Sequence, residues 1–558
     1  MKQRLYIGLL LASVVLVYSN ALWNAFTMDD NLYITGNPQV IAPTVRALFT
    51  PNKASNVFRP VTFATFAANW AAGRGQPFGF HLINLFLHAS VTCLLYLLLQ
   101  DLLASSLQGN LVAFAAASLF AVHPIHTEAV SSIVGRAELL AAGFLFAAWI
   151  LHLQDREIAA LACFVLALLS KESAVVFLPL VLVGDYARGK FESVYRYVRV
   201  AGVTVLYLGF LWKIQGGHFG MDAVYKLDNP LATIPPLWRI LNALRVAWKY
   251  VGLQFYPAAL SCDYSFNQIP VHLDLRHTLP WAIATLIALG AWMWAVKKRR
   301  RGLVLAGGIY LAGFATTANI LMPAGTIMGE RLAYLPSVGF CLLIAMAWVG
   351  LQNRNRVLQF GLLAIVMAAL GVRSVVRNLD WKDDLTLYSA AVRAVPGSAK
   401  MHADLATEYV NSGQAELARK EFQAALQINP VYPDAMEAYG ILEARAGNYQ
   451  KGGRLLADAL YMSGRNNPNY DYMAVNLAAV LMQTDQMDSA LDVLNREIAE
   501  SPKYARAWSN RAVIRYKRGE TTAARIDAET ALRLDPSNRQ AQNLIALLNA
   551  SAPSVSSR

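Results

Sequence analysis

The sequence predicts an all-α protein in which a polytopic membrane domain is followed by a helical repeat domain. Three observations predict this class. The chain has 558 residues, of which 56% are hydrophobic and 15% charged, which is too long and too apolar for a single water-soluble core. About eleven apolar runs fill the first two thirds. The last third changes to amphipathic helices with a regular proline period.

These patterns define four expected parts of the chain. Residues 1–378 form the membrane domain, 379–396 a linker, 397–550 the repeat domain and 551–558 a disordered tail. A membrane-spanning helix needs about 20 mostly apolar residues. The expected spans are 5–23, 80–103, 110–123, 137–153, 158–170, 173–187, 199–214, 279–296, 303–321, 332–350 and 356–373. The first of them resembles a signal peptide, and we expect it to remain as an uncleaved anchor.

Basic clusters set the expected orientation, because Lys and Arg remain on the cytoplasmic side of a membrane. The strongest cluster is Lys297–Arg301. Eleven spans with the N-terminus inside and the C-terminus outside keep this cluster in the cytoplasm. Residues 239–256 are apolar enough for a twelfth span, but Arg239, Arg245 and Lys249 recur at helical spacing. We therefore expect a helix lying in the membrane interface, with a twelfth span as the alternative.

This topology gathers polar residues on the outer side of the membrane. Two adjacent carboxylates, Asp29 and Asp30, follow the first span directly. The other polar candidates are Arg59, His81, His123, His126, Glu128, Arg136, Lys171, Glu172, Glu330 and Arg331. Charged groups within a membrane cost about 2.5–3.5 kcal/mol and usually have a partner or a function. The mixture predicts a polar cavity with acids to act as a base and cations to hold a phosphate. Solvated loop charges or structural ion pairs are the alternative.

The C-terminal part carries an internal repeat. Prolines occur at 396, 430, 468, 502 and 536, which gives spacings of 34, 38, 34 and 34 residues. A 34-residue period of paired helices is typical of tetratricopeptide repeats. We expect about four repeats and a final helix near 539–549, with Gly413, Gly447 and Gly519 where paired helices approach. Such a solenoid has a concave groove suited to an extended peptide, although a spacer or oligomerisation arm remains an alternative.

Composition also restricts partners and cofactors. Residues 1–396 carry 31 Lys and Arg against 18 Asp and Glu, whereas the remainder carries 18 of each, so the net charge of +13 belongs to the apolar part. Contact with lipid explains it better than contact with nucleic acid. The four cysteines form no CxxC pair, which argues against a zinc or disulfide framework. We predict no metal or other cofactor, although Asp29, Asp30 and Glu128 could form a divalent site.

Several motifs make the chain resemble the TMTC family of transmembrane O-mannosyltransferases with C-terminal tetratricopeptide repeats. The most extensive is HPIHTEAVSSIVGRAELL at 123–140. The others are Asp29-Asp30 with Asn37-Pro38, Arg59-Pro60, FHLIN at 80–84, SKE at 170–172, LSCDYSF at 260–266 and ERLAYLPSVG at 330–339. The motifs extend over nearly the whole membrane part. The repeat domain is shorter than in eukaryotic members, which indicates a bacterial relative.

The resemblance implies a GT-C-type glycosyltransferase that uses a sugar carried on a polyprenyl phosphate. It implies that Asp29 is the catalytic base and that Asp30 orients it, or the reverse. Arg331 is then the first candidate for the lipid phosphate, with Lys171 and Arg136 next. Glu128 and His126 would contact the sugar or the acceptor. In-line attack by an acceptor hydroxyl would invert the anomeric centre.

The expected function is therefore transfer of a sugar to a protein acceptor held by the repeats, on the outer face of the membrane. We expect a multi-pass protein of the bacterial inner membrane with a periplasmic repeat domain, or alternatively of the endoplasmic reticulum. Transfer to a glycan or lipid acceptor, or of a whole oligosaccharide, is a close variant. A membrane-anchored repeat scaffold for envelope assembly is the alternative without catalysis.

Overall fold

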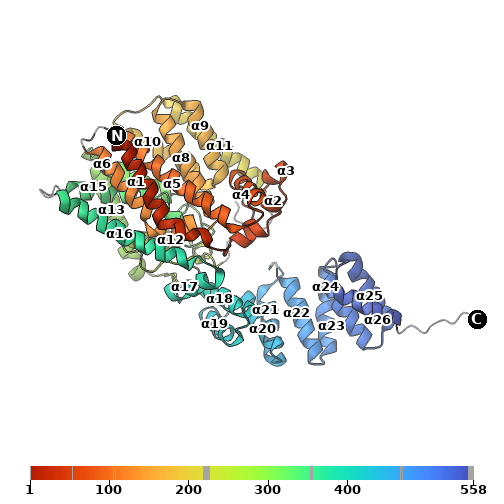
Figure 1. The fold of residues 1–558 in the computed structure, drawn as a ribbon. Coiled ribbons are helices and arrows are strands. Elements are labelled where there is room, and N and C mark those ends of the chain that lie inside the picture. The colour runs from red at the N-terminus through yellow and green to blue at the C-terminus, as the bar shows by residue number, and fades with distance from the viewer. Residues whose placement is uncertain are drawn as a thin grey trace, which may run out of the picture. The chain divides into compact units, whose positions relative to one another are not determined.

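The computed structural model describes residues 2–52, 55–104, 106, 108–217, 226–351, 356–465, 467 and 469–550. Contacts divide the chain into two compact units, Met1–Ser398 and Ala399–Arg558. Within the described residues every regular element is a helix and no strand occurs (Figure 1). The all-α prediction is therefore confirmed. Each unit is described by itself.

The first half of unit 1 extends from Lys2 to Arg188 and consists of helices joined by polar loops. Its elements are α1 (Lys2–Tyr18), η1 (Ser19–Trp23), η2 (Asn31–Thr35), α2 (Pro38–Ile41), α3 (Val45–Leu48), α4 (Pro60–Gly73), α5 (Pro77–Leu102), α6 (Gly109–Val122), η3 (Pro124–His126), α7 (Thr127–Ser131), α8 (Arg136–Leu153), α9 (Glu157–Ser170), η4 (Glu172–Val176) and α10 (Phe177–Arg188). The short elements η2 to α3 lie in the polar segment that follows the first apolar helix.

The second half of unit 1 alternates apolar helices with longer connections. Its elements are α11 (Val194–Ile214), η5 (Pro230–Thr233), α12 (Pro236–Phe255), α13 (Leu275–Lys297), α14 (Arg301–Phe314), η6 (Glu330–Ala333), α15 (Ser337–Gly350), α16 (Arg356–Asp380) and α17 (Asp384–Ala394). Residues 379–396 were expected to be a linker, but α17 forms within them. Leu387 and Ala391 of α17 are fully buried, which explains why the segment is helical.

Several helices of unit 1 indicate a multi-pass membrane protein. Within the described residues, six are long and apolar enough to cross a membrane, or seven if the bent pair Gly109–Val122 and Pro124–Ser131 is one span. Three further apolar helices are shorter, namely α9, α14 and α15. Each of the eleven expected segments contains a helix. Because length and composition alone identify these helices, the count of eleven spans stays a prediction.

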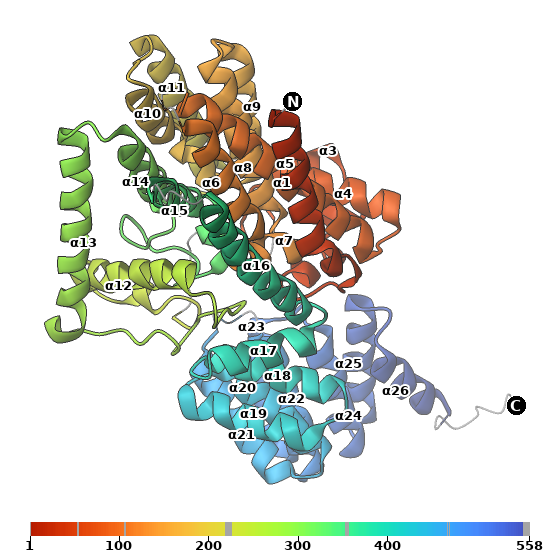
Figure 2. The ribbon, with the colours of Figure 1, turned by 60° about the vertical axis from the view of Figure 1, so that its left-hand side comes forward.

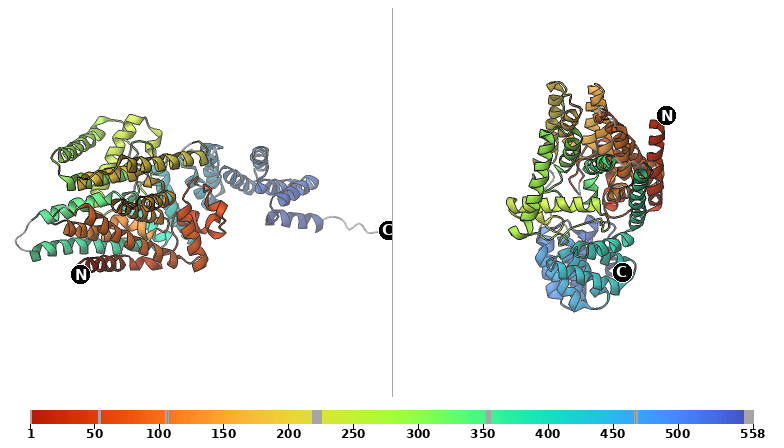
Figure 3. Two further views of the ribbon diagram at one scale, coloured as in Figure 1. Left: turned by 90° about the horizontal axis from the view of Figure 1, so that it is seen from above. Right: turned by 90° about the vertical axis from the view of Figure 1, so that its left-hand side faces the viewer.

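The core of unit 1 is formed by α5, α6 and α8. Helix α5 packs against α6 and α8, and α6 also packs against α15, so these helices run alongside one another (Figure 3). The middle of α6 is rich in alanine, and Ala113, Ala115 and Ala116 are fully buried. Small residues allow helix backbones to approach closely in a membrane. Gly339 has the same role where α15 meets α14, since a Cβ there would lie 2.3 Å from the Ala306 carbonyl oxygen.

Helix α12 corresponds to the segment 239–256 that we expect in the interface. It is not among the described helices that are long and apolar enough to cross a membrane. It packs against α13 and lies across the N-terminal end of that helix (Figure 2). Its position is compatible with an interfacial helix, and this expectation stays a prediction.

Unit 2 consists of four antiparallel helix pairs and one final helix, as the repeat period predicts. The helices are α18 (Ala399–Asn411), α19 (Ala415–Ile428), α20 (Pro433–Arg445), α21 (Tyr449–Ser463), α22 (Tyr470–Gln483), α23 (Met487–Glu500), α24 (Ala505–Lys517), α25 (Thr521–Leu534) and α26 (Arg539–Ala550). Pro468 and the expected disordered tail 551–558 lie outside the described residues.

The repeat glycines have a different role from the one we expected. Gly413, Gly447 and Gly519 lie in the turns between paired helices with φ of 75°, 86° and 79°. A Cβ at any of them would meet nothing within 4 Å, so close helix approach does not explain them. They supply the left-handed turn conformation that glycine adopts without strain. In the third pair the residue in this conformation is Asp485.

Candidate active site

The loop after the first apolar helix is held in a strained conformation that presents Asp29. Met28 has a φ of 50°, which costs a residue with a side chain about 1–2 kcal/mol. The Met28 amide donates to Asp384 Oδ1 at 2.7 Å. The Asp29 carbonyl oxygen accepts from the amides of Leu32 and Tyr33 at 3.1 and 2.9 Å. The backbone is therefore fixed on both sides of Asp29 while its carboxylate makes no hydrogen bond within the described residues.

Asp29 faces an arginine that is anchored by a second acid. The Arg331 amide donates to Glu128 Oε2 at 2.9 Å, and its guanidinium Nη1 donates to Glu128 Oε1. Arg331 Nη2 lies 4.0 Å from Asp29 Oδ2, too far for a hydrogen bond. The surrounding protein disfavours the charge of Arg331, but Glu128 and Asp29 outweigh this effect and raise its pKa. The guanidinium thus stays charged, with N–H groups to spare.

Asp30 points away from this group, although it is the next residue. Its Oδ2 accepts from the Thr27 amide and its Oδ1 from the Val134 amide, both at 3.0 Å. The side chain is fully buried. Burial raises the pKa of Asp30 to about 7, against the opposing effect of these two backbone hydrogen bonds. Asp30 therefore fastens the Asp29 loop to the turn at 132–135.

A second group of charges joins the loop before α4 to the start of η4. The Arg59 guanidinium donates from Nε and Nη2 to both oxygens of Glu172, at 3.0 and 2.6 Å. Lys171 Nζ donates to Glu138 Oε1. The surrounding protein disfavours the charge of Glu172, but Arg59 and Lys171 outweigh this effect and lower its pKa to about 2. Burial lowers the pKa of Lys171 despite the favourable charge of Glu138.

The two groups belong to one polar region, and Glu138 connects them. Its charge acts on Arg59, on Lys171 and on Arg331. The region is open to solvent, since the side chains of Asp29, Arg331 and Glu172 are 37%, 31% and 47% exposed. The region contains four carboxylates, Asp29, Glu128, Glu138 and Glu172, and three cations, Arg59, Lys171 and Arg331. We did not single out Glu138 from the sequence.

The three candidate histidines have partners inside the protein instead of facing this region. His81 Nε2 lies 3.1 Å from the Asn24 carbonyl oxygen, and His123 Nε2 lies 2.9 Å from that of Gln254. His126 contacts the Phe120 carbonyl oxygen at 2.8 Å and Ser337 Oγ at 2.7 Å. All three side chains are buried. His81 joins α5 to the loop after η1, while His123 and His126 join the break after α6 to α12 and α15.

Arg136 likewise has a full set of internal partners. Its Nε donates to Asn84 Oδ1 at 2.9 Å, and its Nη2 donates to the Phe80 carbonyl oxygen at 3.0 Å. The guanidinium lies over the Phe66 ring, 4.8 Å from its centroid, and the side chain is fully buried. This arrangement buries the guanidinium among protein partners, so it does not present Arg136 to a lipid phosphate, the role that the family resemblance implies for it.

Glu330 is adjacent to Arg331 but faces the protein interior. Its Oε1 accepts from the Ser261 amide at 2.5 Å and from the Tyr264 hydroxyl at 2.7 Å. Its Oε2 lies 3.7 Å from Arg377 Nη2. Burial raises the pKa of Glu330, while the charge of Arg377 opposes this shift. Glu330 therefore secures the loop that carries Arg331, and the LSCDYSF segment supplies its partners.

The first and last apolar helices of unit 1 are joined beside the Asp29 loop. Asn378 on α16 donates to the Val17 carbonyl oxygen and to Asn20 Oδ1, both at 2.8 Å. In return, Asn24 donates to the Asn378 carbonyl oxygen at 3.1 Å. The Ala25 amide donates to the Lys382 carbonyl oxygen at 2.9 Å. These hydrogen bonds fix the end of α16 and the residues that follow it to the segment that leads into the Asp29 loop.

The possible divalent site of Asp29, Asp30 and Glu128 does not assemble. Asp30 oxygens accept from backbone amides, and both Glu128 oxygens accept from Arg331. Among the described residues, the group of three ligands that converges closely enough for a metal ion lies elsewhere, at His272, Asp274 and His277.

Comparison with known proteins finds similarity in both parts of the chain. The tetratricopeptide repeat family matches residues 403–471 and 475–539. A protein O-mannosyl-transferase of Caenorhabditis elegans is 31% identical over 442 residues, which cover 76% of this chain and 63% of that protein. The protein O-mannosyl-transferase TMTC3 of Mus musculus is 27% identical over 598 residues, covering 95% of this chain and 64% of that protein.

The chain resembles the TMTC family. It spans about two thirds of the length of these two TMTC relatives, 63% and 64%. The alignment with the mouse protein covers 95% of the chain, so it extends over most of both units. Among solved structures, the tetratricopeptide protein YrrB is 17% identical and covers 36% of this chain and 98% of its own, with a TM-score of 0.26. A TM-score this low carries no further conclusion.

Proposed function

We propose that the chain is a membrane glycosyltransferase that moves a sugar from a polyprenyl-phosphate carrier to a hydroxyl group of a protein. The observation that carries the proposal is the pair of Asp29 and Arg331, a half-exposed carboxylate 4.0 Å from a charged guanidinium. A hydroxyl nucleophile needs a carboxylate that can take its proton. A phosphate leaving group needs a cation that meets its developing charge. The names of the TMTC relatives support the same class of reaction.

The proposed reaction is a single displacement. Asp29 takes the proton of the acceptor hydroxyl as its oxygen attacks the anomeric carbon. The bond from that carbon to the phosphate oxygen breaks, and the phosphate leaves with the electron pair. Arg331 then pairs with the phosphate through N–H groups that Glu128 leaves free. Attack from the side opposite the phosphate inverts the anomeric centre.

The ion pairs of the second group can serve the donor in the same region. Arg59 uses Nε and Nη2 for Glu172, so its Nη1 remains for a phosphate or a sugar hydroxyl. Lys171 is held by Glu138, which keeps an ammonium group beside the proposed phosphate position. The excess of one carboxylate over the cations suits the positive charge that develops on a sugar during transfer.

The repeats are proposed to hold the protein acceptor. Four helix pairs with a final helix form a solenoid of the kind that binds extended peptides. We place Asp29 and the repeats on the outer, periplasmic face of a bacterial inner membrane, because eleven spans with a cytoplasmic N-terminus give that result. The same topology in an endoplasmic reticulum would place both in the lumen.

Turnover by the purified full-length protein tests the proposal. The donor is polyprenyl-phosphate-linked mannose, the sugar named in the relatives, and the readouts are sugar transfer to protein and release of polyprenyl phosphate. We expect Asp29→Asn to lower kcat by about 10²-fold or more, since a positioned base contributes about 10²–10⁴-fold. Asp155→Asn is a matched control. The side chain of Asp155 is also exposed, at 61%, and is also paired with an arginine, Arg196.

The outcomes discriminate between enzyme and scaffold. Full turnover by Asp29→Asn would remove Asp29 as the base. If the wild-type protein turns over none of a panel of polyprenyl-linked sugars, the non-catalytic scaffold is the better description. If the donor is consumed but the sugar reaches a glycan or a lipid, the acceptor class in the proposal is wrong while the transfer reaction stands.

A further inference from the structure

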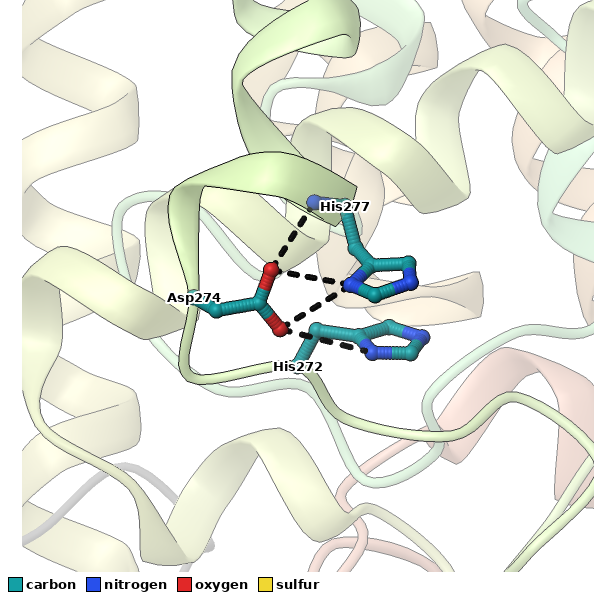
Figure 4. A group of neighbouring side chains, drawn as sticks. All are labelled: His272, Asp274 and His277. Carbon is teal, nitrogen blue, oxygen red and sulfur yellow. Dashed lines mark hydrogen bonds and ion pairs between the residues drawn. The ribbon is translucent and has the colours of Figure 1, made fainter.

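Three potential metal ligands meet at the start of α13 (Figure 4). They are His272, Asp274 and His277, and one ligand atom from each lies within 4.8 Å of the other two. His277 Nδ1 lies 2.9 and 3.0 Å from the two Asp274 oxygens. His272 Nδ1 lies 3.9 Å from Asp274 Oδ2. The reaction proposed above uses none of these residues.

Two rigid elements hold the three ligands in place. Asn242 of α12 donates to the His272 carbonyl oxygen at 2.8 Å and accepts from the His272 amide at 3.0 Å. Asp274 caps α13, since its Oδ1 accepts from the His277 amide at 3.0 Å. His272 is thus fixed to α12, and Asp274 and His277 belong to the first turn of α13. Ligands held by such supporting hydrogen bonds form more precise sites than ligands on free loops.

The donor set matches a divalent transition metal. Two imidazoles and one carboxylate, with further positions open to water, are typical of catalytic zinc and non-haem iron sites. Metal–ligand bonds of about 2.0–2.2 Å place tetrahedral ligands about 3.3–3.5 Å apart. The separations of 2.9 and 3.0 Å between His277 and Asp274 lie below this range, and that of 3.9 Å between His272 and Asp274 lies above it.

Binding requires the two imidazole rings to turn. They stack at 13° to each other with centroids 4.3 Å apart, whereas a bound ion must lie near the plane of each ring. The side chains of His272, Asp274 and His277 are 25%, 49% and 51% exposed, so rotation about the side-chain bonds meets little obstruction. The backbone positions need not change.

We propose that His272, Asp274 and His277 bind one divalent transition-metal ion, of the zinc type, which fastens the α12-bound loop to the first turn of α13. The ion is structural in this proposal. Helix α12 also holds the loop that carries Arg331, because the Tyr250 hydroxyl bonds both the amide and the carbonyl oxygen of Gly329 at 2.9 Å. A metal that braces α12 therefore stabilises unit 1 without taking part in the reaction.

One nearby cation opposes the binding of an ion. Arg245 donates to the Pro270 carbonyl oxygen at 2.6 Å, and its charge acts on His272. Asp274 provides the compensating negative charge. The competing explanation is a helix cap with an ion pair, in which Asp274 and His277 bind each other and no metal.

Zinc binding to the full-length protein in detergent tests the proposal. The protein carries no polyhistidine tag and is treated with a chelator before Zn²⁺ is titrated by calorimetry. We expect one equivalent of Zn²⁺ to bind and to raise Tm, and the double variant His272→Ala/His277→Ala to lose both effects. Asp274→Asn should weaken zinc binding at least tenfold while keeping the helix cap, since asparagine caps helices as well as aspartate does.

His402→Ala is the matched control, because His402 also pairs with a carboxylate, Glu421, at 2.6 Å but does not belong to a converging group of three metal ligands among the described residues. It should bind Zn²⁺ as the wild type does. Co²⁺ provides a second measurement, since visible absorption bands should appear in the wild type and be absent in Asp274→Asn. If wild type and double variant bind the same amount of Zn²⁺ with the same affinity, or if neither binds, the proposal is wrong and the helix cap explains the group.

Discussion

Asp29 and Asp30 are neighbours in the chain but differ in every contact. Asp29 is half-exposed beside Arg331, whereas Asp30 is fully buried and accepts hydrogen bonds from two backbone amides. The difference follows from the left-handed conformation of Met28 and from Val134, which lies more than a hundred residues further along the chain. The sequence could show that two acids follow an apolar helix. It could not show which of them is turned inward, because that depends on a contact between distant segments.

The burial of Asp30 predicts a pH dependence of stability. Its pKa is raised to about 7 in the folded protein, against an ordinary value of 3.8, so the folded state binds its proton more tightly than the unfolded state. Stability from this group is fully present below about pH 4 and is lost as pH rises towards about 7. We expect Asp30→Asn, measured by thermal unfolding in detergent from pH 4 to 8, to show a flatter profile than the wild type. If Tm depended on pH in the same way in the variant and the wild type, the raised pKa of the buried Asp30 would be contradicted.

Arg136 predicts a loss of stability without a specific loss of donor binding. Its guanidinium donates to Asn84 Oδ1 and to the carbonyl oxygens of Phe80 and Thr65. Arg136→Met removes these donors and leaves the buried Asn84 Oδ1 without this partner, at about 1–3 kcal/mol. We expect a lower Tm, and an unchanged KM for the polyprenyl-linked donor in the protein that remains folded. An intact Tm with a raised KM would instead make Arg136 a phosphate ligand.

At the scale of elements, hydrophobic length and period predicted most of the helices. The paired repeat helices follow from the proline spacing, and α17 was missed because its eleven residues lack that period and the length of a span. In the sequence, the sign of the break after α6 is Pro124, which lies between His123 and His126. The sequence did not predict that His126 bonds Ser337 across this break, because the partner is on α15, more than two hundred residues away.

The crossing of α14 and α15 depends on one glycine. A Cβ at position 339 would lie 2.3 Å from the Ala306 carbonyl oxygen and 2.9 Å from the Tyr310 amide nitrogen. These are backbone atoms, so the helices would have to separate. We expect Gly339→Ala to lower Tm and turnover together. Gly350→Ala in the same helix is the control, because a Cβ there meets nothing within 4 Å. It should be neutral or stabilising by up to about 1 kcal/mol. Equal effects of the two variants would contradict a close crossing at Gly339.

At the scale of the whole molecule, the contacts of the chain separate after Ser398. The sequence predicts a change of character near residue 397, where the charge balance shifts. Composition could not decide how many of the apolar helices cross the membrane. Six or seven satisfy length and apolarity, and the others are short enough to end within the bilayer.

The expected topology can be measured with reporter fusions. An alkaline phosphatase reporter after Ser398 should be active, because this enzyme folds only outside the cytoplasm. A reporter after Arg301 should be inactive, because the basic cluster there remains inside. An inactive reporter after Ser398 would place the repeats on the opposite side from Asp29 and remove their proposed role in acceptor binding.

The junction between the first and last apolar helices has a consequence for biosynthesis. The Asp29 loop is held by Asn378, Lys382 and Asp384, which leave the ribosome more than three hundred residues after it. The first helix is therefore inserted before the partners of its loop have been synthesised. The loop can reach its final conformation only after α16 has been inserted. We expect chains that stop before α16 to be inert towards any donor, so that a nascent protein cannot begin the reaction before it is complete.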